Sequence, residues 1–231
     1  MSARLMARFA GFLYLIVIIG GAFAEAFVRQ HLIVHDDAAA TAAGILANEP
    51  LYRLGFVADL VPLLCNVLLA AIFYHLFRPV NRSLARLVVF FSLIGTTIQA
   101  AALLFDLGPL LVLQNSQPLG AFSLPQLQAL AYLCLRFQAH GYTIALLFFG
   151  GFGMAIGWLI FRSGFLPRLI GALMMIAGLC YFTNSLLTFI APSLSSVLFL
   201  LPCLLGEGSL ALWLFFVGLN EARWKALSGE A

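Results

Sequence analysis

The sequence predicts an all-α, polytopic membrane protein, a single bundle of six transmembrane helices. Hydrophobic residues make up 63% of the 231 residues and charged residues only 9%, whereas a soluble domain has about 25% charged residues. The mean hydropathy is +1.06. Six segments reach the roughly 17–25 apolar residues that a helix needs to cross a bilayer. Together these observations exclude a soluble fold.

The apolar segments fill the whole chain, so we expect one integral membrane domain, residues 1–231. The expected spans are residues 9–28, 54–77, 84–105, 140–161 with a helical extension upstream, 169–190 and 195–219. The first span follows Arg4 and Arg8, and its sequence resembles that of a signal peptide. Its apolar stretch of 20 residues exceeds the roughly 7–15 residues of a signal-peptide core. We therefore expect it to be retained as a transmembrane helix.

Basic residues predict the orientation of the bundle, because they concentrate in cytoplasmic connections. Only Arg29 and Arg53 flank one side. The other side carries Arg4, Arg8, Arg78, Arg82, Arg86, Arg162, Arg168, Arg223 and Lys225. This asymmetry predicts that both termini are cytoplasmic. It also accounts for the net charge of +3, so we expect the lipid bilayer as partner and no nucleic acid.

Two local sequence patterns predict a short helix outside the spans and a close contact between two spans. Asp36 and Asp37 precede an alanine-rich run that ends near Pro50, which is typical of a short capped helix. Gly153 and Gly157 lie four residues apart inside an apolar helix, where small residues allow two helices to approach closely. We interpret these glycines as a packing seam and not as a nucleotide-binding loop.

Polar residues recur at helical spacing in the spans, and they are expected to face one another because hydrocarbon offers them no partners. The topology places six ionisable side chains in the outer half of the bundle: Glu25, Asp59, Asp106, Arg136, His140 and Glu207. Further polar lining is expected from Asn66, Gln99, Tyr181 and Asn184. The sequence therefore predicts one buried ionic pocket, with Arg136 and His140 as its cationic members.

The pocket leaves three functional hypotheses. Placing a charged side chain near the bilayer centre costs ~2.5–3.5 kcal/mol of insertion free energy. Arg136, with His140 when it is protonated, compensates only part of the four carboxylates, so the remainder requires a bound proton, a cation or water. The first hypothesis is a protein that binds or carries a small molecule, ion, proton or lipid ligand. The second is a metal-assisted intramembrane enzyme acting on a lipid or another membrane-soluble substrate, with His140, Asp59 and Glu207 as metal ligands. The third is a purely structural polar network. No sequence motif indicates a cofactor.

Five blocks of sequence carry a resemblance to a known family. They are ARFAGFLYL at 7–15, DDAAATA at 36–42, FRPVNR at 77–82, HGY at 140–142 and FRSGFLPR at 161–168. In these blocks the chain resembles a family of bacterial multi-pass membrane proteins known only as a domain of unknown function. The resemblance implies a six-helix architecture in the bacterial inner (plasma) membrane. It implies no substrate and no catalytic residue.

Overall fold

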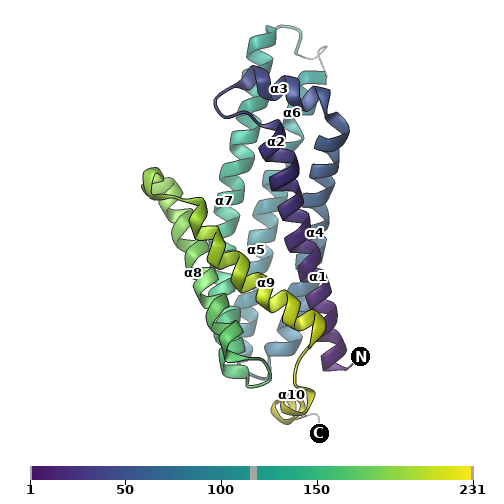
Figure 1. Ribbon diagram of the computed structural model, residues 1–231, viewed down its shortest axis with the longest axis vertical. Helices are drawn as coiled ribbons and strands as arrows, with labels where there is room; N and C mark the ends of the chain where they lie inside the picture. The colour runs from purple at the N-terminus through teal and green to yellow at the C-terminus, as the bar shows by residue number, and fades with distance from the viewer. Residues whose placement is uncertain (1, 115–118, 230–231) are drawn as a thin grey trace.

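The computed structural model describes residues 2–114 and 119–229, most of which are helical and none of which is in a strand. Six helical segments are long and apolar enough to cross a membrane. They are Ala3–Leu32, Glu49–Phe77, Arg82–Gln114, Leu124–Ser163, Arg168–Ile190 and Val197–Phe216. The predicted all-α fold class and the six spans are therefore confirmed (Figure 1).

Several of these segments are composed of shorter elements. In chain order they are α1 (Ala3–Phe23), the π-helix η1 (Ala24–Arg29), α2 (Gln30–Leu32), α3 (Ala38–Ala47), α4 (Glu49–Phe77), α5 (Arg82–Asp106), α6 (Gly108–Gln114), α7 (Leu124–Ser163), α8 (Arg168–Ile190), the 3-10 turns η2 (Pro192–Leu194) and η3 (Val197–Phe199), α9 (Leu200–Phe216) and α10 (Glu221–Ser228). At 1.5 Å per residue α7 is about 60 Å long, twice the thickness of the hydrocarbon. The helical extension expected upstream of residue 140 is therefore confirmed.

Local capping explains where the helices begin and end. The side chain of Asp37 accepts a hydrogen bond of 2.8 Å from the backbone N–H of Ala40, so the predicted capped helix is present as α3. Asn81 accepts one of 2.9 Å from the N–H of Leu84 at the start of α5. Gly164 ends α7 with a φ of 68°, a left-handed conformation that glycine adopts without steric cost.

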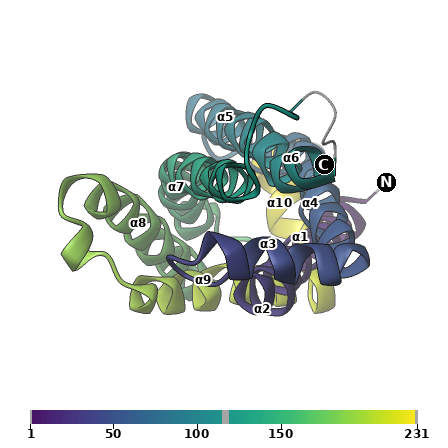
Figure 2. The same cartoon turned by 90° about the horizontal axis from the view of Figure 1, so that it is seen from above.

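The six spans form a ring in which each helix packs against two neighbours. Around this ring α1 packs against α4, α4 against α5, α5 against α7, α7 against α8, α8 against α9, and α9 against α1. Figure 1 shows both termini at one end of the bundle and α3 and α6 at the other. We call these the terminal end and the outer end. Figure 2, seen from above, shows α7 between α5 and α8 and shows α9 passing below α3.

Large apolar side chains fill the part of the ring nearer the terminal end. Phe73 of α4, Ile156 of α7 and Leu214 of α9 are all buried there in one cluster. Arg4 and Arg8 of α1 donate to the backbone oxygens of Val217 and Phe216, at 3.3 and 3.0 Å. Cations at a helix C-terminus satisfy its free carbonyls. The start of α1 is thereby attached to the end of α9.

The predicted glycine seam is confirmed between α7 and α8. A methyl group added at Gly157 would lie 2.7 Å from the carbonyl oxygen of Gly171, and one at Gly153 would lie 2.9 Å from the Cα atom of Gly178. Such distances leave no room for a side chain, so the two helix backbones are in direct contact.

We predict that Gly157→Ala destabilises the protein by about 1–3 kcal/mol, because the added methyl group forces α7 and α8 apart. Gly208→Ala is the matched control, since a methyl group there would meet no described atom within 4 Å. Equilibrium unfolding in mixed micelles measures both variants. The direct backbone contact would be contradicted if Gly157→Ala were as stable as Gly208→Ala.

Candidate functional site

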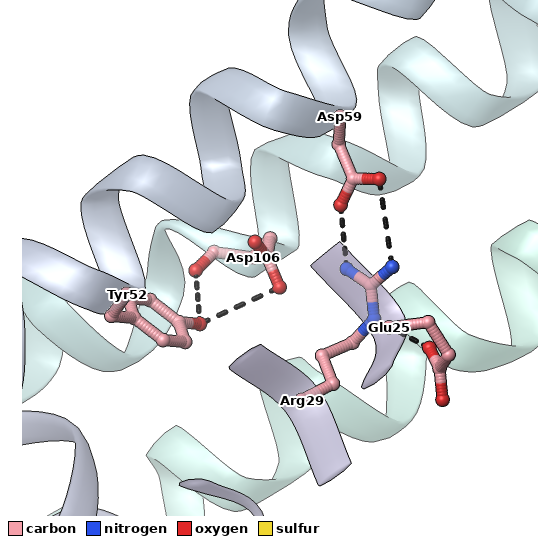
Figure 3. A network of polar contacts seen from close by, with 5 residues as sticks. All are labelled: Glu25, Arg29, Tyr52, Asp59 and Asp106. Atoms are coloured by element: carbon pink, nitrogen blue, oxygen red, sulfur yellow. Dashed lines mark hydrogen bonds and ion pairs between the residues drawn. The ribbon is translucent and has the colours of Figure 1, made fainter. Parts of the chain in front are cut away.

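An ionic cluster lies at the outer end, where Arg29 joins two carboxylates from different helices (Figure 3). Its Nη1 lies 2.5 Å from Oδ2 of Asp59 on α4, and its Nε lies 2.8 Å from Oε2 of Glu25. Arg29 and Asp59 are mostly buried, with 15% and 8% of their side chains exposed, whereas 56% of Glu25 is exposed. Arg29 is therefore the countercharge of Asp59 inside the bundle.

The backbone positions this pair through a π-helical turn and a glycine. Glu25 and Arg29 both belong to η1, and π turns within α-helices are frequent at functional sites. Gly55 of α4 leaves room for Val28: a methyl group at Gly55 would lie 2.8 Å from a methyl carbon of Val28. Asp59 follows Gly55 by one helical turn and so shares its face. The close approach at Gly55 thus brings Asp59 within reach of Arg29.

Asp106 lies near this cluster and is bound by a different partner. The hydroxyl of Tyr52 donates to the backbone oxygen of Asp106 at 2.5 Å and lies 3.5 Å from its Oδ1 atom. Both residues are buried. Within the described residues Asp106 makes no ion pair. Figure 3 shows Tyr52 and Asp106 beside the Arg29 cluster.

Glu207 forms a second polar site, in the middle of the last span. One carboxyl oxygen accepts a hydrogen bond of 3.2 Å from the Tyr14 hydroxyl on α1, and the other accepts one of 3.1 Å from the Tyr181 hydroxyl on α8. Tyr14 precedes Arg29 by 15 residues in the same span, which is about 22 Å along a helix. Glu207 shares no hydrogen bond or ion pair with the described residues of the outer cluster, so the structure has two sets of polar contacts where the sequence predicts a single pocket.

Arg136 and His140 of α7 do not take the role of cationic partners. Both are exposed, and neither forms an ion pair with a described residue. The His140 Nδ1 atom lies 2.7 Å from the Arg136 carbonyl oxygen, and its ring lies 6.1 Å from that of Phe189. The expected pairing of Arg136 with the acids is corrected: Arg29 pairs with Glu25 and Asp59.

The residues predicted as further polar lining also lie in separate places and do not line one pocket. Tyr181 contacts Glu207, as described above. Asn184 instead holds the connection between α8 and α9, because its side-chain oxygen accepts from the Ser195 hydroxyl and the Ser196 N–H, each at 3.1 Å. Asn66 and Gln99 are half-buried on α4 and α5.

The metal ligands expected from the sequence do not come together. His140 is exposed on α7, Asp59 is paired with Arg29, and Glu207 is held by two tyrosines. In residues 2–114 and 119–229 no group of three or more His, Cys, Asp or Glu side chains is placed to hold a metal ion. This geometry does not support the proposed metal-binding set.

The fold and these two clusters define a multi-pass α-helical membrane protein with ionisable groups between its spans. Residues 9–218 match the family described as Domain of unknown function (DUF4386), and the chain belongs to this family. The family membership confirms the resemblance found in the sequence. No curated protein and no solved structure matches the chain. Because the family description names no activity, the function has to be argued from the clusters themselves.

We predict that Arg29→Gln lowers the free energy of unfolding by roughly 3 kcal/mol, because it leaves Asp59 buried without its countercharge. The double variant Arg29→Gln/Asp59→Asn should lose less than the sum of the two single variants. Equilibrium unfolding in micelles measures all three.

Arg53→Gln provides the matched control for this prediction. Arg53 also pairs with a glutamate one turn away, with its Nε 2.7 Å from Glu49, but 55% of its side chain is exposed. Exposed pairs of this kind contribute less than about 1 kcal/mol. If Arg29→Gln were no more destabilising than Arg53→Gln, the outer cluster would not stabilise the bundle.

Proposed function

We propose that the protein binds and carries a proton or a small cation across part of the membrane, and that Glu207 is the binding group. The observation that supports this proposal is its carboxyl group, which lies in mid-span and accepts a hydrogen bond at each oxygen from a tyrosine on another helix. Within the described residues it forms no ion pair.

The electrostatics of the site favour cation or proton binding. Placing a carboxylate near the bilayer centre raises the free energy of membrane insertion by ~2.5–3.5 kcal/mol. The two phenol groups satisfy its oxygens as acceptors but bring no positive charge. A bound proton, or a cation beside the carboxylate, supplies the missing charge. Asp59 differs, because Arg29 already neutralises it.

We further propose that a route from the outer end to Glu207 runs along α1. Tyr14, Gly21 and Glu25 share one face of the helix, being seven and four residues apart. A methyl group added at Gly21 would meet no described atom within 4 Å, and the same holds at Gly208, beside Glu207. Water, a proton or a small cation would therefore enter past Glu25. The ligand role predicted for Glu25, Asp59, Asp106, Arg136 and His140 stays a prediction.

We expect infrared difference spectra of the protein in nanodiscs, recorded while pH is varied, to contain a band from a protonated carboxyl group. Glu207→Gln should remove this band, because the amide cannot bind a proton. Asp59→Asn is the control that should retain it. Repeating the series with Na⁺ and K⁺ distinguishes the bound species, because a cation that occupies the site competes with the proton.

Tyr14→Phe and Tyr181→Phe test the tyrosines. Each removes one hydroxyl donor, so each should shift the frequency of the Glu207 band without abolishing it. Identical spectra for the wild type and Glu207→Gln, with and without Na⁺ and K⁺, would contradict the proposal.

We also propose that the protein resides in a bacterial plasma membrane with both termini in the cytoplasm. Support comes from the arginines that gather at the terminal end, among them Arg78, Arg82 and Arg162, since basic residues are retained on the cytoplasmic side.

A fusion experiment in a bacterial host tests this orientation. Green fluorescent protein attached to the C-terminus should fluoresce, and alkaline phosphatase attached there should be inactive, because the latter requires the periplasm. Fusions after Asn48, at the outer end, should give the opposite pattern. Active phosphatase at the C-terminus would reverse the orientation.

A further inference from the structure

A pocket of about 310 Å³ opens at the terminal end, between the turn that joins α4 to α5 and the short helix α10. It is lined by Tyr74, Arg78, Pro79, Arg82, Leu227 and Ser228. Among the described residues this lining brings two arginines, a tyrosine and a serine together and includes no carboxylate. Neither Arg78 nor Arg82 is in an ion pair with a described residue.

Trp224 holds α10 in place as one wall of this pocket. Its indole N–H donates to the backbone oxygen of Leu76 at 2.9 Å, and its ring stacks on His75 with centroids 5.7 Å apart. Trp224 is buried, although the rest of α10 is largely exposed. Because Leu227 and Ser228 follow Trp224 by about one turn, this anchor places them against Arg78 and Arg82.

The start of α5 adds further positive potential. Arg82 is the first residue of α5, and the side chain of Asn81 bonds only the N–H of Leu84. The other N–H groups of the first turn point towards the terminal end, where the helix dipole favours an anion. Guanidinium groups bind phosphate oxygens through paired, charge-assisted hydrogen bonds. The combined chemistry is that of a phosphate site.

We infer that this pocket binds the phosphate of an anionic phospholipid. Free phosphate has the same chemistry, but the surroundings favour a lipid. Arg82, Arg86 and Phe90 lie on one face of α5 at four-residue spacing, and all three are exposed. Phe90 lies about 12 Å along the helix from Arg82, towards the hydrocarbon. A headgroup at the arginines therefore places its acyl chains beside apolar side chains. The inference does not depend on the role of Glu207.

Other arginines at the terminal end provide a matched control. Arg162 lies over the ring of Trp158 at 5.4 Å, and Arg168 lies over the ring of Phe161 at 5.8 Å. They carry the same charge at the end of the molecule that holds the pocket, on either side of the turn between α7 and α8. Diffuse attraction of anionic lipid to the surface would weaken equally when either pair is replaced.

Native mass spectrometry of the full chain in detergent tests the inference with three probes: dihexanoyl phosphatidylglycerol, dihexanoyl phosphatidylcholine and inorganic phosphate. The variant Arg78→Gln/Arg82→Gln should bind phosphatidylglycerol at least about tenfold more weakly than the wild type, because charge-assisted hydrogen bonds are lost. Arg162→Gln/Arg168→Gln should stay within about twofold of the wild type. Phosphatidylcholine should bind weakly to every variant.

A second variant keeps the test informative if the first does not fold. Ser228→Glu places a carboxylate at the pocket wall on a surface residue, and it should also weaken phosphatidylglycerol binding about tenfold. Equal losses in the two arginine pairs, or no loss in Arg78→Gln/Arg82→Gln, would overturn the site. Inorganic phosphate that binds as tightly as phosphatidylglycerol, and competes with it, would overturn the assignment to a lipid.

Discussion

A polar group between transmembrane helices must find its partner on another helix, because hydrocarbon supplies none. This constraint determines where the first span lies. At its outer end Arg29 pairs with Asp59 of α4, and at mid-depth Tyr14 donates to Glu207 of α9. α1 also packs directly on both α4 and α9. The polar contacts and the apolar packing therefore fix the same three helices relative to one another.

The two polar sites differ in how their charge is balanced. At the outer end a guanidinium group faces two carboxylates, one of which is largely exposed. That arrangement is typical of an ion pair that fixes helix register, and a structural role explains it fully. At Glu207 the partners are two neutral hydroxyl groups. A structural role explains the hydrogen bonds there but not the uncompensated charge, which is why the binding proposal rests on Glu207.

The arginines at the terminal end share one positive charge each but make different contacts. Arg4 and Arg8 cap the end of α9. Arg162 and Arg168 lie over aromatic rings, and Arg78 lines a pocket together with Arg82. The count of basic residues that predicts the orientation of the bundle does not distinguish these contacts. Their separate contacts arise only when the ends of distant helices meet.

The sequence by itself determined the spans, the α3 cap at Asp37 and the seam at Gly153 and Gly157. Helix length, capping and the small side chains that allow close packing are each set by residues that lie near one another in the chain. The tertiary structure decided that Arg29 and not Arg136 meets Asp59, and that Glu207 meets Tyr14 and Tyr181. Those outcomes depend on the rotation of each helix about its axis, on its offset along its neighbours and on the π turn at Glu25. The spacing of residues within one helix specifies none of these. The i, i+4 relation of Glu25 to Arg29 was the available signal, but a basic residue at a span end resembles an ordinary membrane anchor.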